Sequence, residues 1–122
     1  AGEPGGIWAG WARDRLRDPG PAAVEVQVAV HRWAGVPLVF LPGEPFVEFA
    51  LELRAALGDP GLLVAGYTGG VPGYLPYPES HYGAGGYEIE EAHRAYGLRA
   101  AFTPEAGRLV MAAARELLGE AG

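Results

Sequence analysis

A chain of 122 residues is long enough for one domain or for part of one. Apolar residues make up 49% of it, which supports a hydrophobic core, yet no apolar run approaches the roughly 18–20 residues that span a membrane. The formal charge is −6 and the basic residues form no cluster, which argues against nucleic acid as a partner. The chain has no cysteine, so disulfides and thiolate metal ligands are excluded.

Residues 1–23 are expected to form a lead and a short helix. Residues 1–6 predict no regular structure, and residues 7–17 can form a helix that the prolines at positions 19 and 21 end. The chain starts at Ala1 and shows no signal-peptide pattern. We therefore expect a processed or truncated product, and a cytoplasmic location agrees with the lack of a signal peptide and of cysteine.

Residues 24–67 predict the order strand, strand, helix, strand. Residues 24–32 alternate valine with mostly polar side chains, a period of two that is typical of a half-buried strand. After a turn at Ala34-Gly35, the apolar run 36–41 indicates a second, more deeply buried strand, so we expect a hairpin. Pro45 suits the first position of a helix over residues 46–57, and residues 62–67 are a third strand candidate.

The rest of the chain predicts a long loop and a final helix. Residues 68–86 are rich in glycine and tyrosine without a clear period, and residues 87–96 are expected to form a strand and then a helix. Thr103-Pro104 favours a helix start. The buried face of this last, amphipathic helix is predicted to consist of Leu109, Val110, Ala113 and Leu117.

Because strands and helices alternate, the predicted fold class is α/β. We expect a layered sheet with an N-terminal hairpin-like strand pair, a central helix after Pro42-Gly43-Glu44 and a C-terminal amphipathic helix. The segments are residues 1–23, 24–67, 68–86 and 87–122.

Glu44 is a candidate functional residue because it lies just past the end of a predicted buried strand. Ligands of α/β sheets bind at that edge, and the start of the next helix would favour the ionised carboxylate, the form that binds a metal. The alternative is that Glu44 only caps the helix.

The glycine-rich stretch 66–88 contains tyrosines that suggest a second functional element. A loop of this length in a compact domain is commonly functional. A phenol can donate a hydrogen bond to a developing oxyanion or ligate a metal as a phenolate. The alternative is that the tyrosines only pack on the sheet; the five are Tyr67, Tyr74, Tyr77, Tyr82 and Tyr87.

The three histidines match no metal-ligand spacing. We interpret His31 and His93 as structural residues, and the role of His81, which lies within the tyrosine-rich stretch, stays open.

The stretch around Glu44 and the glycine-rich stretch 66–88, together with the predicted order of strands and helices, resemble the neutral and alkaline, non-lysosomal ceramidase family. The similar region is the C-terminal part of the catalytic domain. The similar motifs are Pro42-Gly43-Glu44, Gly66 with Tyr74, and Gly86-Tyr87-Glu88, followed by Tyr96-Gly97. The resemblance covers residues 24–118. Pro45 and Gly69 differ from the characterised ceramidases, and the pattern is similar to the short bacterial branch of the family.

The resemblance implies a zinc-dependent amidohydrolase of sphingolipid metabolism that cleaves N-acyl amides, with a lipid amide as substrate. By position it assigns Glu44 and Tyr74 as zinc ligands and Tyr87 as the residue that stabilises the tetrahedral intermediate. It places the two histidine ligands and a serine in the N-terminal part of the same protein, which would be the partner of this chain. The chain would then be inactive alone, with zinc absent or weakly bound.

A second interpretation is a stand-alone, non-catalytic α/β module that self-associates or binds a protein partner. Under either interpretation we expect exposed apolar surface, and an exposed apolar surface favours a homo-oligomer.

Overall fold

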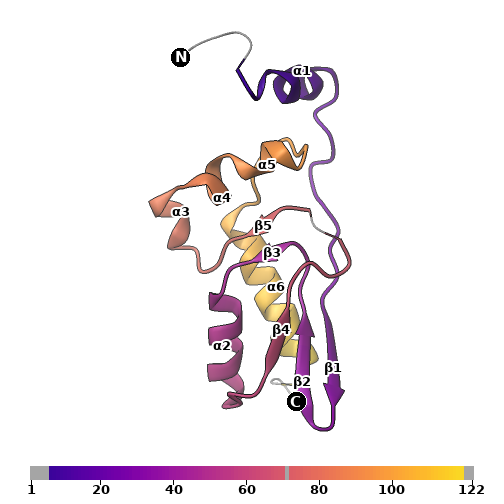
Figure 1. Ribbon diagram of the computed structural model, residues 1–122, viewed down its shortest axis with the longest axis vertical. Coiled ribbons are helices and arrows are strands. Elements are labelled where there is room, and N and C mark those ends of the chain that lie inside the picture. Colours follow the sequence, from indigo (N-terminus) through magenta and orange to yellow (C-terminus); the bar gives the residue numbers. More distant parts are fainter. Residues whose placement is uncertain (1–5, 71, 120–122) are drawn as a thin grey trace.

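A small β-sheet flanked by helices forms the body of the chain in the computed structural model, which describes residues 6–70 and 72–119 (Figure 1). The fold is therefore mixed α/β. No helix within the described ranges is long and apolar enough to cross a membrane. The elements in chain order are α1 (Ala9–Arg17), β1 (Ala29–Trp33), β2 (Val36–Phe40), β3 (Glu44–Pro45), α2 (Glu48–Leu57), β4 (Leu63–Ala65), β5 (Tyr74–Leu75), α3 (His81–Ala84), α4 (Tyr87–Glu90), α5 (Ala92–Ala95) and α6 (Pro104–Leu117).

The N-terminal strand pair is an antiparallel hairpin with its turn at Ala34-Gly35, where φ is 50° and 83°. The predicted start of the first strand at residue 24 is wrong, because β1 begins at Ala29, the partner of Phe40. β2 ends at Phe40, and beyond it the N–H of Leu41 donates to the carbonyl of Ala65 at 2.8 Å, toward β4. Residues 24–28 therefore have no strand beside them in the described part of the chain.

The next unit, β2–α2–β4, pairs its two strands in parallel, with α2 as part of the connection. Gly58 ends α2 in the left-handed conformation, with φ of 62°. The predicted helix start at residue 46 is wrong: Pro45 lies in β3, and the N–H of Phe46 donates to the carbonyl of Leu75 at 3.2 Å. β4 is also shorter than the predicted strand 62–67.

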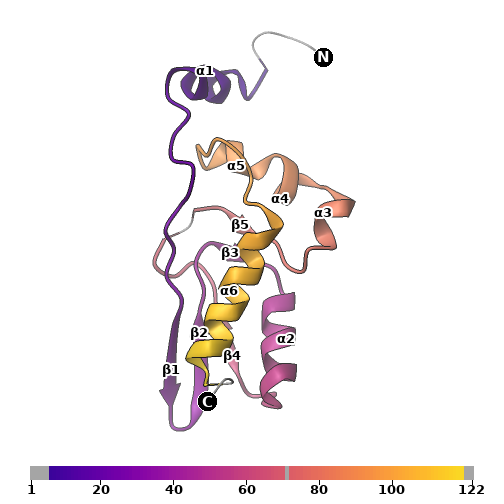
Figure 2. The same cartoon turned by 180° about the vertical axis from the view of Figure 1, so that it is seen from behind.

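The hydrophobic core lies between the sheet, α2 and α6, and α6 covers one face of the sheet (Figure 2). The order of the sheet is β1-β2-β4. The buried side chains come from this sheet, from the two helices, from residues that adjoin them and from β5; they are Val39, Leu41, Phe49, Leu53, Leu62, Leu75, Val110, Met111, Ala114 and Leu118.

The buried face of α6 includes the predicted Val110 but otherwise differs from the prediction. Leu109 and Leu117 are 63% and 53% exposed, and the buried residues of the helix are Gly107, Val110, Met111 and Ala114. Gly107 explains the rotation, because a Cβ there would lie 2.6 Å from the carbonyl oxygen of Pro76. α6 packs closely on the segment after β5 at Gly107. The residues on the same face of the helix as Gly107 are therefore the buried ones.

Short elements occupy the segment predicted as a loop, residues 68–86. β5 pairs in parallel with β3, and α3 follows it. The strand predicted at the start of residues 87–96 is wrong, since α4 and α5 are two short helices. The N–H of Glu90 donates to the carbonyl of Gly86 at 2.9 Å, and the acidic residues of this first turn suit the positive end of a helix.

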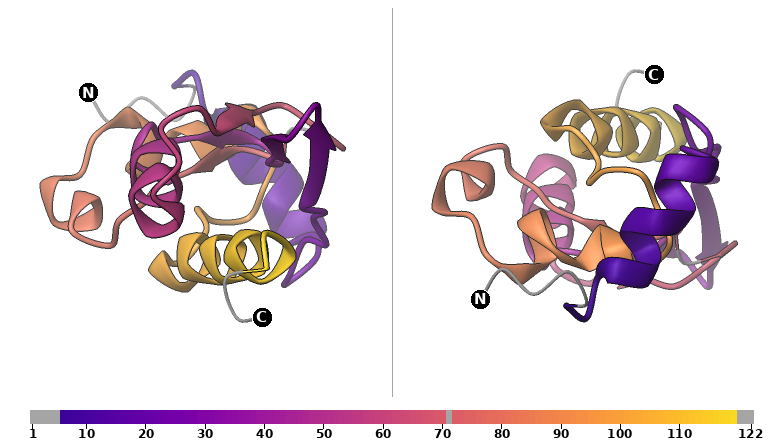
Figure 3. Two further views of the ribbon diagram at one scale, coloured as in Figure 1. Left: turned by 90° about the horizontal axis from the view of Figure 1, so that it is seen from below. Right: turned by 90° about the horizontal axis from the view of Figure 1, so that it is seen from above.

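Helix α1 lies against α5, as the view from above shows (Figure 3). Trp11 donates its Nε1 hydrogen to the carbonyl of Leu98 at 2.6 Å and meets His93 edge-on at 5.5 Å between ring centroids. The guanidinium of Arg94 lies 5.4 Å from the Trp11 ring. The predicted helix at residues 7–17 is present from Ala9, and the prediction for residues 1–5 lies outside the described residues.

Candidate functional site

Strand pairing places Glu44 and Tyr74 next to each other. They are partners in the parallel β3–β5 pair, which the N–H of Glu44 holds by donating to the carbonyl of Gly73 at 2.9 Å. Gly43 allows this close approach, because its φ is +65° and a Cβ there would lie 2.4 Å from that carbonyl oxygen. The two residues predicted as metal ligands thus meet at one place.

The carboxylate of Glu44 is surrounded by phenols. Tyr67 Oη donates to Oε1 at 2.6 Å, Tyr96 Oη donates to Oε2 at 2.5 Å, and Tyr74 lies beside Glu44 as its strand partner. The bonds from Tyr67 and then Tyr96 lower the pKa of Glu44, since they favour its charged form over the opposing effect of burial. No cation of the described residues forms an ion pair with Glu44.

The interpretation of Glu44 as a helix cap is wrong. Glu44 lies in β3, and α2 begins four residues later at Glu48, with Val47 at the N-cap position and no side-chain cap. The carboxylate is kept ionised by hydrogen bonds from tyrosines.

Tyr74 and Tyr87 also come together. Their ring centroids are 6.4 Å apart with an interplanar angle of 81°. Burial, and then the charges of Glu44 and Glu88, raise the pKa of Tyr74, so Tyr74 is a protonated phenol at neutral pH. Tyr87 is the first residue of α4 and is 47% exposed, which leaves its ring accessible beside the Glu44–Tyr74 pair.

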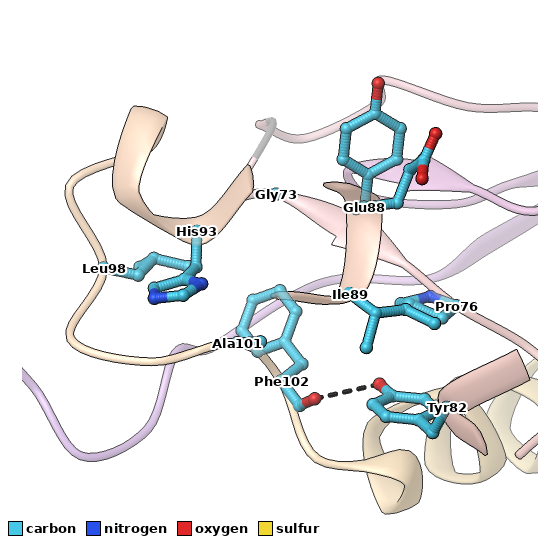
Figure 4. A pocket seen from close by; sticks show the side chains of 10 residues that line it. Gly73, Pro76, Tyr82, Glu88, Ile89, His93, Leu98, Ala101 and Phe102 are labelled. Atoms are coloured by element: carbon cyan, nitrogen blue, oxygen red, sulfur yellow. Dashed lines mark hydrogen bonds between the residues drawn. The ribbon is translucent and has the colours of Figure 1, made fainter. Parts of the chain in front are cut away.

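The remaining two tyrosines of the stretch, Tyr77 and Tyr82, contact residues outside the sheet. Tyr77 lies against the buried ring of Phe49 at 4.9 Å between centroids. Tyr82 Oη donates to the carbonyl of Phe102 at 2.9 Å, at a small cavity of about 10 Å³ that Glu88 and His93 also line (Figure 4). That volume is close to a single water, so this cavity is a gap in packing.

The histidines make contacts away from this cluster. His81 Nε2 lies 2.6 Å from Glu48 Oε1 and edge-on to Phe46. His31 packs on Phe40. No histidine among the described residues hydrogen-bonds to Glu44, and the interpretation of His31 as structural agrees with its ring contact.

Sequence reasoning gave no role to Tyr67 and Tyr96, the two residues that bond to Glu44 most closely. Tyr67 belongs to the predicted tyrosine group and Tyr96 to the Tyr-Gly motif, but neither signal indicates a shared acceptor. Their meeting depends on the turn after β4 and on the end of α5; the sequence predicts a helix at the end of residues 87–96, as α5 confirms, but not where that helix lies relative to Glu44.

The cluster fits zinc in part. A carboxylate and a phenol are oxygen ligands that zinc accepts, but a zinc site uses at least three protein ligands. Residues 6–70 and 72–119 contain no group of three His, Cys, Asp or Glu side chains that could hold a metal. Glu44 and Tyr74 can therefore form part of a site. No family model, no characterised protein and no solved structure matches this chain.

Proposed function

We propose that this chain is part of a zinc-dependent amidohydrolase similar to neutral ceramidases, to which it contributes Glu44 and Tyr74 as ligands. The observation that carries the proposal is the register pairing of these two residues on β3 and β5, with an ionised carboxylate that has no cationic partner among the described residues. Such a carboxylate is well suited to bind a cation.

The roles proposed for Glu44, Tyr74 and Tyr87 follow from the oxygen atoms of their side chains. Zinc, when bound, polarises an amide carbonyl or activates a water. Glu44 would hold the metal through a carboxylate oxygen, and Tyr74 would hold it through its phenol oxygen. Tyr87 Oη donates a hydrogen bond to the carbonyl oxygen of the substrate, which strengthens as negative charge develops there.

The remaining ligands belong to a partner, and we assign that role to an N-terminal part of the same protein, in a cytoplasmic enzyme. The outer face of the sheet supports a docked partner. β2 and β4 are parallel and β1 and β2 are antiparallel, so the support comes from the apolar side chains that the outer face exposes. On the face opposite α6, Leu63 is 51% exposed beside the half-buried Leu38.

A lipid amide is the substrate class we propose. A hollow of about 450 Å³ lies beside the candidate site, between residues 21–26 and α6. Its volume is in the range of ligand pockets. Gly43 and Gly73, the neighbours of Glu44 and Tyr74, line it together with apolar side chains such as Leu98 and Phe102.

Substitution of Glu44 tests the proposal. In the complete protein, Glu44→Ala should abolish zinc binding, measured by metal analysis after dialysis, and hydrolysis of N-acyl amides together. Glu25→Ala is the matched control, because Glu25 is exposed and lies outside the cluster. Full zinc content and activity in Glu44→Ala would refute the ligand assignment. Tight stoichiometric zinc in the 122-residue chain would refute the claim that ligands are missing.

The alternative, a non-catalytic module that self-associates, is supported by a different surface. Val47 and Leu51 lie one turn apart at the start of α2 and are 66% and 57% exposed. Sedimentation of the chain with and without Leu51→Lys tests this alternative. Because either proposal allows this chain to self-associate and to lack zinc, a dimer that Leu51→Lys dissociates would favour the module only if the complete protein also binds no zinc.

A further inference from the structure

The two oxygens of the Glu44 carboxylate have separate donors. Tyr67 serves Oε1 and Tyr96 serves Oε2, at 2.6 and 2.5 Å. Hydrogen bonds from hydroxyl groups to a carboxylate are charge-assisted and stronger than bonds between neutral groups. Each oxygen keeps a second lone pair, so both bonds are compatible with a further contact to the same carboxylate.

The donors come from outside the strand pair that carries Glu44 and Tyr74. Tyr67 follows β4, and Tyr96 follows α5. Each of these two hydrogen bonds connects the carboxylate to a different part of the chain. The rotamer of Glu44 is therefore restrained from two sides, whereas strand register alone would fix only its backbone.

The turn at Tyr67 is built around the segment that precedes Glu44. Tyr67 has a positive φ of 58°, which is uncommon for a residue with a side chain. Its N–H donates to the carbonyl of Gly43 at 2.8 Å, and Thr68 donates its N–H and its hydroxyl to the carbonyl of Leu41 at 3.1 and 2.8 Å. A Cβ at Gly66 would lie 2.8 Å from Pro45. These contacts hold an unusual conformation, and that conformation brings the Tyr67 hydroxyl to Glu44.

From this geometry we propose that Tyr67 and Tyr96 are positioning residues that hold the Glu44 carboxylate in the orientation in which it binds zinc. The proposal rests on the function proposed above. Hydrogen bonds to a ligating carboxylate orient it, and their removal typically lowers metal affinity about 10–100-fold. If the two hydrogen bonds to Glu44 only joined segments of the chain, their removal would lower stability and leave metal affinity unchanged.

Zinc titration of the 122-residue chain tests the proposal. ZnCl₂ is added by isothermal titration calorimetry in millimolar imidazole, which supplies nitrogen ligands from solution. Tyr67→Phe and Tyr96→Phe should each raise the Kd for Zn²⁺ by about 10-fold. Tyr82→Phe, which removes a hydroxyl that serves Phe102, should leave the Kd unchanged. Thermal unfolding without zinc reports stability separately. An unchanged Kd in both variants overturns the proposal, whether or not their stability falls.

A metal-free measurement separates this proposal from the function proposed above. The isolated chain supplies only two of the proposed ligands, so if the wild type does not bind zinc in imidazole, positioning is decided by three-bond NMR couplings at Glu44. The wild type should show one χ1 rotamer, and the double variant Tyr67→Phe/Tyr96→Phe should show averaged couplings. Couplings that are identical in the two proteins overturn the positioning role.

Discussion

Replacing Gly43 by alanine should separate the cost of a strained backbone from the cost of a blocked contact. Gly43 has φ of +65°, and its Cβ would lie 2.4 Å from the carbonyl oxygen of Gly73. Gly58 has nearly the same φ, +62°, but a Cβ there meets nothing within 4 Å. Gly58→Ala is therefore a matched control that carries the backbone cost alone.

The magnitude follows from these distances. An alanine in the left-handed region costs about 1–2 kcal/mol at either position. At Gly43 an ordinary contact begins near 3.4 Å, so the oxygen must retreat by about 1 Å, at an overpacking cost of about 1–3 kcal/mol. That movement also strains the bond from the Glu44 N–H, which contributes about 1 kcal/mol. Gly43→Ala should thus destabilise the chain by about 2–4 kcal/mol more than Gly58→Ala.

Urea unfolding followed by far-UV circular dichroism measures both free energies of unfolding. Hydrogen exchange of the Glu44 amide reports the strand pair directly, and we expect it to quicken in Gly43→Ala alone. Equal destabilisation by the two substitutions, with the Glu44 amide still protected, would refute the reasoning.

Three further outcomes are expected. Phe49→Ala should cost about 3–5 kcal/mol in urea unfolding, because the ring is fully buried, whereas Leu51→Ala, at a 57% exposed position, should change stability by about 0.5 kcal/mol or less. The Tyr96–Glu44 hydrogen bond raises the pKa of Tyr96 to about 12, so its stabilising effect should be full below pH 10 and lost as the pH rises through about 12. The same bond helps to lower the pKa of Glu44 from 4.5. The stabilisation by this bond should therefore also be lost at acid pH, as the pH falls below 4.5 and Glu44 becomes protonated. Comparing wild type with Tyr96→Phe across both windows checks this, and a constant difference would contradict it. Trp11→Ala should speed hydrogen exchange in residues 9–17 while lowering global stability by no more than about 3 kcal/mol, since it removes one hydrogen bond, one cation–π contact and the edge-on contact with His93. Cooperative loss of the whole fold would contradict this.

Local patterns of sequence predicted the types of most elements but not their ends. The alternation at residues 24–32 indicates a strand correctly, yet only Ala29–Trp33 has a partner. The length of β1 depends on where its partner β2 ends, at Phe40, and tertiary contacts determine that end. Pro45 has the same ambiguity, because its fixed φ suits the start of a helix and also a short edge strand.

The candidate site was predictable only as separate positions, because the resemblance named Glu44, Tyr74, Tyr87 and Tyr96 but not the hydrogen bonds to the carboxylate. Glu44, Tyr74 and Tyr87 were identified by motif, and the structure brings them together. The partners of the carboxylate, Tyr67 and Tyr96, lie 23 and 52 residues from Glu44 in sequence. Their positions depend on a left-handed backbone at one residue and on two short helices, for which the sequence has no periodic signal.

Because β3 pairs with β5 in one register, the geometry of the site depends on the number of residues in the segments that precede these strands. One residue inserted between Gly43 and Glu44 would place the carboxylate on the opposite side of the pleat from Tyr74, with every side chain of the cluster unchanged in identity. A residue inserted in the turn after α2 should be tolerated far better, since that turn is exposed at Pro60 and Gly61. Among homologous chains, gaps should therefore be absent from residues 41–45 and 73–75 and frequent near residue 60. Spacing, as well as residue identity, would then mark a chain that keeps the site.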